Sequence, residues 1–450
     1  MRLPILPLRQ ALRLLPAPCL ALVGAGGKTT ALFQIARQLK PPVFVTSSTH
    51  LSKNQLNLAD KHIILQNPED MELIEAYLDS EEVVLVTGSL HEAERTSGVD
   101  AISLEHIYSI TKARSIPMLI EADGSRQQPL KAPADHEPAI PPFVDSVILV
   151  AGLSGLGKPL TSEWVHRPEL FASLSGLASG DIISVDALAK VLTSPLGGLK
   201  GIPQGTRRIV LLNQADTLGR QALALVLATR LVPAYHAVVV ASLQPPTTGL
   251  PRILAVHEPV AGIILAAGGS SRMGQPKQLL PWKGEPLVRS VASTALSAGL
   301  SPVVLVTGDH GSQVQAAVQD LPLKLVQNPD WESGQSSSIQ AGLSALSPET
   351  GAAIFLLADQ PRVSVTLLRS LIERHAETLA PVVAPRVADQ RANPVLFDRL
   401  TFHDLMSIHG DIGGRAIFSL YPVNWLEWQD ERLLLDVDTA EDYRRLVDEE

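Results

Sequence analysis

The chain has 450 residues, a net charge of −9, a hydrophobic fraction of 45% and a single cysteine, Cys19. This length exceeds what one ordinary hydrophobic core holds, so we expect two or three domains. The acidic balance argues against a protein that coats nucleic acid, because neutralising backbone phosphates needs a basic surface. One cysteine excludes an intramolecular disulfide framework and a thiolate cage around a metal, which suits a reducing cytoplasm.

The first 22 residues are apolar, but arginines and prolines interrupt them and a glycine-rich turn follows directly. A signal peptide needs an uninterrupted apolar stretch and a small-residue cleavage site. No other segment approaches the roughly 20 apolar residues of a membrane span. We therefore expect a cytoplasmic protein that does not enter a membrane.

Short apolar runs alternate with helix-sized amphipathic stretches along the whole chain. The runs occupy residues 19–23, 43–46, 83–87, 118–120, 147–150, 209–212, 238–241, 262–266, 303–307, 352–357 and 381–383. Runs of this length, rich in Val, Ile and Leu, indicate parallel strands covered by helices on both faces. A turn-rich stretch at 244–251 and a weak connector at 255–259 divide them. We predict an α/β protein with domains 1–255 and 260–450, each a Rossmann-like three-layer unit with a mostly parallel sheet.

The first predicted strand runs into the glycine-rich loop GAGGKTT, and a helical pattern follows. Glycines let backbone amides approach phosphate oxygens, and a helix start adds positive potential. The candidate ligand-binding residues are Gly24, Gly26, Gly27, Lys28 and Thr29. Lys28 would reach the terminal phosphates of ATP or GTP, and Thr29 would coordinate Mg²⁺. The full phosphate-loop pattern needs a further glycine where Leu22 stands, so the loop is only phosphate-loop-like, and a tight turn is the alternative.

Three later segments support a nucleotide site in the first domain. Acids follow the strand at 118–120, and we favour Asp123 for positioning water or metal. The segment 213–216 is similar to the guanine-reading motif of GTPases, but Gln214 replaces its lysine, so guanine specificity stays open. His50 lies in a loop that resembles a switch or substrate loop, although a lone histidine is more often structural.

A second glycine-rich loop, AAGGSSRMGQPK, follows the strand that begins at residue 262. Its backbone amides suit phosphate binding, and Arg272 and Lys277 would neutralise a triphosphate. The candidate loop contacts are Ala267, Gly268, Gly269 and Ser270. A plain strand-to-helix turn is the alternative, which the spacing of the two basic residues makes less attractive.

Acidic residues supply a candidate magnesium site in the second domain. Asp359 directly follows the strand at 352–357, at the ligand-bearing edge of a parallel sheet. Mg²⁺ binds few carboxylates together with substrate phosphates, so Asp359 and a second acid would suffice. Asp436 and Asp438 share one face if extended, and Asp438 is our candidate. Alternatively, Asp359 caps a helix and Thr439 caps the final one.

The segment NPDWESGQSSSI, at 328–339, is a polar loop that enters a helix. Ser336 and Ser337 are candidate readers of a base or phosphate through their hydroxyls and the adjacent amides. A capped helix start is the structural alternative.

Six segments occur in the order seen in molybdenum cofactor nucleotidyltransferases: LAAGGSSRMGQPK, NPDWESGQSSSI, ADQP, NPVLF, GDIGGR and DVDTAED. Over roughly the last 190 residues, about one domain, the chain most closely resembles the cytidylyltransferase branch. The LAAG start favours this branch over the guanylyl branch, which typically carries LAGG.

This resemblance implies a fold like that of nucleotide-diphospho-sugar transferases and a reaction. CTP would bind the loop at 266–277, and Asp359 with Asp438 would hold Mg²⁺. The terminal phosphate of molybdopterin would attack the α-phosphate, and pyrophosphate would leave. Asn393 would belong to the ligand-binding residues, and Arg415 would clamp the incoming phosphate, unless it forms a surface salt bridge.

The N-terminal half carries a second resemblance. VGAGGKTT, EADGSRQQPLKAPADHEP and VHRPE are similar to segments of accessory proteins of selenium-dependent molybdenum hydroxylases. This likeness spans most of residues 15–245. It implies a phosphate-loop-NTPase-like fold and a pathway, the completion of molybdenum cofactor for a hydroxylase client, but no reaction.

Together these patterns predict a Mg²⁺-dependent molybdenum cofactor cytidylyltransferase fused to a nucleotide-binding maturation domain. Two alternatives stay open. The protein could be a cofactor carrier or insertion chaperone with an NTP switch, or its transferase could use GTP or a sugar or polyol phosphate acceptor.

Overall fold

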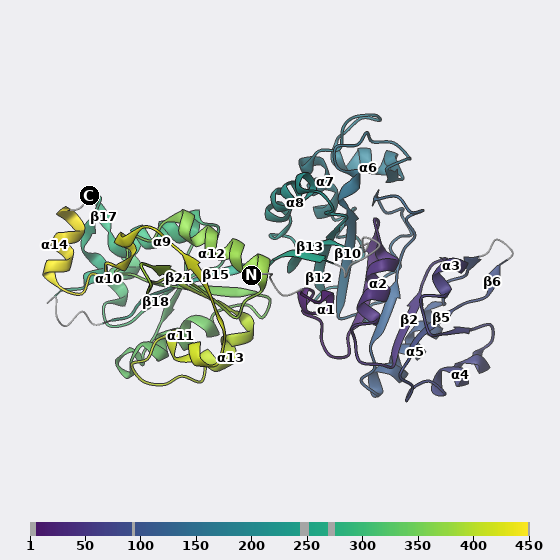
Figure 1. Cartoon of the computed structure of the whole chain (residues 1–450), viewed down its shortest axis with the longest axis horizontal. Helices are drawn as coiled ribbons and strands as arrows, with labels where there is room; N and C mark the ends of the chain where they lie inside the picture. Colours follow the sequence, from purple (N-terminus) through teal and green to yellow (C-terminus); the bar gives the residue numbers. More distant parts are fainter. Residues whose placement is uncertain (1–5, 92–94, 244–251, 269–274, 449–450) are drawn as a thin grey trace. The chain divides into compact units, whose positions relative to one another are not determined.

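The computed structural model describes residues 6–91, 95–243, 252–268 and 275–448. The chain forms two compact units, Met1–His257 (unit 1) and Glu258–Glu450 (unit 2), whose elements are labelled in Figure 1. Across those described ranges, no helix combines the length and the apolar character needed to cross a membrane.

Unit 1 is built on a nine-stranded sheet, as far as the structure describes it, in the order β14-β13-β12-β10-β1-β8-β2-β5-β4. Its strands are β1 (Cys19–Gly24), β2 (Val43–Ser47), β4 (Lys61–Ile64), β5 (Val83–Thr87), β8 (Met118–Glu121), β10 (Ser146–Gly152), β12 (Arg207–Asn213), β13 (Ala237–Ser242) and β14 (Arg252–His257). All neighbours pair in parallel except β13 and β14. The predicted connector at 255–259 is therefore wrong in its first half, because these residues end an antiparallel strand that covers the edge of β13.

The helices of unit 1 are α1 (Leu8–Ala11), α2 (Lys28–Ala36), α3 (Lys53–Leu56), α4 (Glu72–Glu75), α5 (Ala101–Ala113), α6 (Pro168–Ser175), α7 (Val185–Thr193) and α8 (Leu218–Leu231). Side-chain caps fix several helix starts: Asp100 accepts from two amides of α5, and Ser184 and Thr217 cap α7 and α8. Within the part of unit 1 that the structure describes, two small sheets lie outside the main one: β9 (Leu130–Lys131) with β11 (Val165–His166), and β3 (Leu51–Ser52) with β7 (Arg95–Thr96) and β6 (Leu90–His91).

Unit 2 has an eight-stranded sheet, counted over its described residues, in the order β19-β18-β15-β20-β23-β21-β22, with β24 paired to β21. The strands are β15 (Val260–Ala266), β18 (Val303–Thr307), β19 (Lys324–Gln327), β20 (Ala352–Leu357), β21 (Val382–Val387), β22 (Gln390–Arg391), β23 (Val395–Asp398) and β24 (Val423–Glu427). Strands β19, β18, β15 and β20 are parallel, whereas β23 and β22 run antiparallel to their neighbours. The predicted α/β class with mostly parallel sheets is confirmed.

Alternate residues of the central strands of unit 2 supply two cores. Ala261 and Ile263 of β15 pack with α11 (Gln335–Ser344) and α13 (Phe402–Leu405) on one face. Ile264 and Ala266 pack with α9 (Leu287–Ser297) and α12 (Val365–Thr378) on the other, and Figure 1 shows these helix pairs on opposite sides of the sheet. This period of two explains why the strands are apolar throughout. The other helices of unit 2 are α10 (Gly311–Ala316) and α14 (Ala440–Asp448), and a short hairpin joins β16 (Pro281–Trp282) to β17 (Glu285–Pro286).

In both units the strand that leads into a glycine-rich loop is central. Strand β1 lies between β8 and β10, and β15 lies between β18 and β20. After β15 the chain builds β18 and β19 on one side and then returns to β20 on the other. Such a reversal opens a crevice at the carboxyl ends of the strands, where α/β proteins bind ligands.

Candidate functional site

The glycine-rich loop of unit 2 begins beside Asp359. Strands β15 and β20 are paired through Leu265 and Leu357, so the residues that follow them lie at one edge of the sheet. The buried Gln278 fixes the loop, since its side-chain amide donates to the carbonyls of Ala266 (3.2 Å) and Gly268 (2.9 Å). Ala267 is also buried. The predicted contacts Gly269, Ser270 and Arg272 lie outside the described residues.

Lys277 joins the two predicted metal ligands. Its Nζ contacts Oδ2 of Asp359 and lies 2.9 Å from Oδ1 of Asp438. The side chains of Lys277 and Asp359 are 19% and 14% exposed, so water screens their attraction only partly. Burial by itself would lower the pKa of Lys277, but Asp359 and Asp438 outweigh it and raise that pKa. Three residues that the sequence singled out thus meet at one point, with Lys277 positively charged.

The C-terminal segment reaches this point because Val437 anchors it. Val437 is fully buried against Leu280, Leu287 and Leu446 of α14, and its amide donates to the Asp359 carbonyl (3.4 Å). Asp436, on one side of this anchor, accepts a hydrogen bond from the Gln360 side chain. Burial raises the pKa of the Asp436 carboxyl, and the carboxylates of Asp359 and Asp438 raise it further. The packing of one valine therefore brings two more acids to the edge of β20.

The carboxylates of Asp359 and Asp438 fit a magnesium ion that substrate phosphates also coordinate. Both carboxylates converge on a single cation, the Lys277 ammonium group. No cluster of three or more His, Cys, Asp or Glu side chains suited to a metal occurs in the described ranges. Mg²⁺ is commonly held by one or two carboxylates together with substrate phosphates. The donor set present thus fits Mg²⁺ that arrives with a nucleotide.

The start of α11 binds another part of the chain in this structure. The Ser336 hydroxyl donates to the Gly410 carbonyl (2.7 Å), and the Ser337 hydroxyl donates to the Gly334 carbonyl (2.8 Å). The Gln335 amide donates to Asp411 (3.4 Å). The Ser336 hydroxyl, expected to read a ligand, thus holds Gly410 instead, and the Ser337 hydroxyl holds the turn that precedes α11.

Arg415 and Asn393 stay separate from the Lys277 cluster. Arg415 is exposed, and Asn393 is half-buried immediately before β23. Within the described residues, no hydrogen bond or ion pair joins either side chain to Lys277 or Asp359. The surface salt bridge considered for Arg415 is likewise not formed with any described residue.

We expect Gly334→Ala to lower the stability of unit 2 by about 1–3 kcal/mol. Gly334 has φ +109°, and an added Cβ would lie 2.5 Å from the Asp411 amide nitrogen. Gly410→Ala is the matched control, because Gly410 also has a positive φ (+82°) but no atom within 4 Å of an added Cβ. Urea denaturation should show the larger loss for Gly334→Ala. Equal losses would contradict a tight approach of the two segments.

The glycine-rich loop of unit 1 packs closely against β10. Gly26 has φ +84°, and a Cβ there would lie 2.4 Å from the amide nitrogen of Gly152. Lys28 is only 3% exposed. Its Nζ donates to the Gly24 carbonyl (2.7 Å) and lies 3.1 Å from Asp123. The sequence assigned Lys28 to the terminal phosphates, but here its ammonium group is held by the protein.

Thr29 and Glu121 complete this corner of the loop. The Thr29 hydroxyl donates to Glu121 (2.9 Å) and accepts from the Gln55 side chain (2.7 Å). Glu121 also lies 3.9 Å from the Lys28 ammonium group. Burial raises the pKa of Glu121, and the Lys28 charge opposes that rise.

The ion pair of Lys28 continues into a buried network. Lys131 Nζ lies 2.8 Å from both Asp123 and Glu137, and Arg167 donates two hydrogen bonds to Glu137 (2.6 and 2.9 Å). Charges of opposite sign therefore alternate from Lys28 to Arg167. Asp123 was predicted from the sequence, whereas no role was predicted for Lys131, Glu137 or Arg167. All three lie in the segments 121–138 and 165–169 that carried the resemblance.

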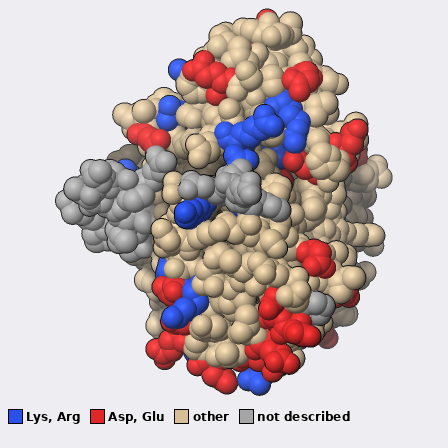
Figure 2. Space-filling model, turned by 90° about the vertical axis from the view of Figure 1, so that its right-hand side faces the viewer, with Lys and Arg blue, Asp and Glu red and all other residues tan. Residues whose placement is uncertain are grey.

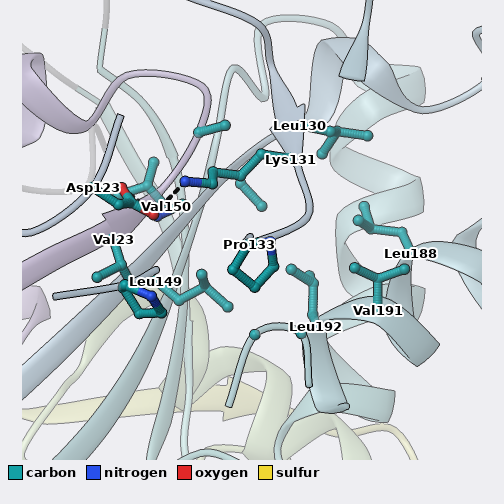
Figure 3. A pocket seen from close by; sticks show the side chains of 16 residues that line it. Val23, Asp123, Leu130, Lys131, Pro133, Leu149, Val150, Leu188, Val191 and Leu192 are labelled. Atoms are coloured by element: carbon teal, nitrogen blue, oxygen red, sulfur yellow. Dashed lines mark hydrogen bonds and ion pairs between the residues drawn. The ribbon is translucent and has the colours of Figure 1, made fainter. Parts of the chain in front are cut away.

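Figure 3 shows the Asp123–Lys131 pair beside a small apolar pocket lined by Val23, Leu149 and Leu192. The pocket encloses about 30 Å³, little more than one water molecule needs. A separate cleft of about 860 Å³ is lined by Gly26, Gly27 and Thr29. Its size is that of small-molecule sites.

The GTPase-like segment supports the loop. The Asn213 side chain donates to the Gly26 carbonyl (2.8 Å) and accepts from the Leu243 amide (3.0 Å). Asp216 forms an ion pair with Arg220 (3.3 Å), whereas Gln214 lines the cleft. Asn213 is thus a structural residue here. His50 also lines the cleft and is hydrogen-bonded to the Thr96 carbonyl (2.9 Å).

We expect unit 1 to lose stability progressively below pH 6.5. Burial, together with the nearby charges of Arg167 and Lys131, lowers the pKa of His166 from 6.5 to about 4. The unfolded chain therefore takes up a proton on this histidine between pH 6.5 and 4, while the folded chain does not, and unfolding is favoured. Burial raises the pKa of Glu137, but hydrogen bonds from Arg167 and Lys131 outweigh it and lower this pKa from 4.5 to about 2. Unit 1 therefore loses further stability as the pH falls below 4.5.

Urea denaturation between pH 7.5 and 4 measures this effect. His166→Gln should flatten the dependence of stability on pH in that window. His106→Gln, at an exposed position of α5, should leave it unchanged. Identical slopes for wild type and His166→Gln would contradict the assignment.

Comparison with known proteins identifies both regions. Residues 262–427 match the model of the MobA-like NTP transferase domain, and residues 20–169 match that of the YqeC protein. The nicotine blue oxidoreductase of Paenarthrobacter nicotinovorans is 35% identical over 198 residues, which are 42% of this chain and 96% of that protein.

Two relatives come from Escherichia coli (strain K12). Its uncharacterized protein YqeC is 33% identical over 201 residues, 43% of this chain and 75% of that protein. Its molybdenum cofactor cytidylyltransferase is 24% identical over 182 residues, 40% of this chain and 92% of that protein. The chain therefore belongs to the YqeC family through its N-terminal region and to the MobA-like NTP transferase family through its C-terminal region.

Proposed function

We propose that unit 2 transfers CMP from CTP to the terminal phosphate of molybdopterin and releases pyrophosphate. The observation that carries the proposal is the meeting of Lys277, Asp359 and Asp438 at the carboxyl edge of β20, beside the glycine-rich loop. The MobA-like domain supports nucleotidyl transfer. The order of six motifs and the similarity to a molybdenum cofactor cytidylyltransferase support the acceptor.

The chain's own residues account for most of the chemistry. Lys277 supplies a positive charge for the triphosphate, and the loop that starts at Ala267 supplies backbone amides. Asp359 and Asp438 would hold Mg²⁺, which when bound neutralises charge on the phosphates. The Lys277 ammonium group and the metal would compete for the carboxylates of Asp359 and Asp438. We therefore expect the ammonium group to leave these carboxylates and to contact phosphate oxygens when the nucleotide binds.

The acceptor is itself the nucleophile. An oxygen of its terminal phosphate forms a bond to the α-phosphorus of CTP, and the bond from that phosphorus to the bridging oxygen breaks. The electron pair leaves with pyrophosphate. Positioning and charge neutralisation supply most of the rate in such a transfer, so no protein nucleophile is needed.

Two other functions are separable from this one. The similarity to the nicotine blue oxidoreductase of Paenarthrobacter nicotinovorans makes a redox reaction a second candidate. The joining of two units in one chain favours a role as cofactor carrier for a molybdenum hydroxylase. Neither activity needs to release pyrophosphate.

The test is a matrix of CTP, GTP, ATP and UTP against molybdopterin and sugar phosphates, with Mg²⁺ and a pyrophosphate readout. We expect release with CTP and molybdopterin. Release with GTP but not with CTP would show that the enzyme transfers GMP. Release only with sugar phosphates would show that the acceptor is a sugar phosphate and not molybdopterin. No release with any pair, together with stable co-purification of a hydroxylase, would favour the carrier.

A further inference from the structure

The large cleft of unit 1 has no role in the proposed transfer, yet it lies where α/β proteins bind ligands. It extends across the carboxyl ends of the strands from Gln214, after β12, to Ser48, after β2. Four spacings separate these strands in the sheet. At about 4.8 Å each, this is roughly 19 Å. The cleft is thus longer than a free phosphate ion fills.

Cationic side chains from three separate segments line this cleft. Arg95 lies on β7, Arg126 follows β8, and Arg167 precedes α6. Arg167 is paired with Glu137, but within the described ranges neither Arg95 nor Arg126 forms an ion pair. Figure 2 shows a group of Lys and Arg side chains lying close together on the face that it draws, which also carries acidic side chains. Two guanidinium groups without an ion-pair partner among the described residues therefore make this cleft attractive to an anion.

The start of α2 provides the second element of the site. Its N-cap residue is Gly27, with φ +117°, and no side chain caps the helix. The first-turn amides have no partner within a helix, and Lys28, Thr29 and Thr30 line the cleft. A helix start without a side-chain cap and the guanidinium groups of Arg95 and Arg126 thus border the same space.

The backbone of the lining is unusual in one respect. Arg126, Gln127, Arg167 and Gln214 all have positive φ values, of 48°, 63°, 64° and 65°. Non-glycine residues in this region cost free energy, and they persist where the surroundings impose them, often at binding sites. The buried network holds Arg167 through Glu137, and Lys131 ties the same network to the glycine-rich loop.

We propose that this cleft is a second nucleotide site, which binds a nucleoside triphosphate independently of the transferase. The phosphates lie between the uncapped start of α2 and the guanidinium groups of Arg126 and Arg95, and the nucleoside occupies the remaining length. Lys28 is a positioning residue, because Asp123 and the Gly24 carbonyl hold its ammonium group under the loop.

The experiment is calorimetric titration of the full chain with ATP, GTP, CTP and tripolyphosphate in the presence of Mg²⁺. Wild type should bind two nucleotides per chain, or one when the nucleotide does not fit the transferase. Removing both exposed arginines, in Arg95→Ala/Arg126→Ala, should weaken one site at least tenfold, about 1.4 kcal/mol. Arg230→Ala, on α8 and outside the cleft, is the matched control and should change nothing.

An Asp359→Asn chain separates this proposal from the transferase. The unit 1 site should persist in it, whatever happens to pyrophosphate release. If the double arginine variant binds every nucleotide like wild type, the cleft is not a nucleotide site. If tripolyphosphate binds unit 1 as tightly as the best nucleotide, the nucleoside part of the proposal is wrong.

Discussion

Asp359→Asn is expected to lower the turnover of the transferase about a hundredfold to a thousandfold while the protein stays folded. The substitution keeps the size of the side chain but removes one of two carboxylates that converge on the same cation. Charge stabilisation at the reacting phosphates then fails, whereas strand β20, which ends two residues before position 359, is unchanged. The measurement is the rate of pyrophosphate release from CTP with molybdopterin at saturating Mg²⁺.

Asp389→Asn is the matched control for this variant. Asp389 is exposed in the turn between β21 and β22, so the same chemical change there should leave turnover unaltered. If Asp359→Asn retained more than half of the wild-type turnover, the metal site would have to be sought elsewhere.

Asp123→Ala is expected to cost unit 1 about 3–5 kcal/mol of its free energy of unfolding. Asp123 is buried, and it accepts from Lys28, Lys131 and the Gly24 amide. Its removal leaves two buried ammonium groups without this partner, which is far more costly than losing an exposed pair. Urea denaturation followed by circular dichroism measures the change, and Asp123→Asn, which keeps a hydrogen-bond acceptor, should lose less.

Asp79→Ala provides the comparison. Asp79 is 93% exposed and forms a 3.5 Å pair with Arg114, so its loss should cost less than about 1 kcal/mol. Equal effects at the two positions would show that the network from Lys28 to Arg167 does not stabilise unit 1.

The sequence predicted those features that depend on local pattern. Apolar runs predicted most of the core strands, and acids placed directly after strands predicted that Asp359 lies at the edge of a sheet. Lys277 and Asp438 were also singled out, and the structure brings them together because β15 and β20 are neighbours and Val437 is buried.

Features that depend on tertiary contacts could not be predicted in this way. The charged network of Lys131, Glu137 and Arg167 depends on the pairing of β9 with β11, which joins distant parts of the sequence. Ser336 lies in a polar loop typical of a ligand-binding site, yet its hydroxyl donates to the Gly410 carbonyl of a distant segment. Strand β14 was missed because its pairing with the edge of β13, rather than a strong pattern of its own, makes it a strand.

The most direct test of the central claim follows the phosphorus atoms of CTP. The protein is incubated with molybdopterin, Mg²⁺ and CTP labelled at either the α- or the γ-phosphate, and the pterin product is separated from pyrophosphate. Nucleotidyl transfer predicts that the α label appears on the pterin and the γ label in pyrophosphate. Transfer of the γ label to the pterin, or its release as inorganic phosphate with no α label on the pterin, would contradict the proposed chemistry.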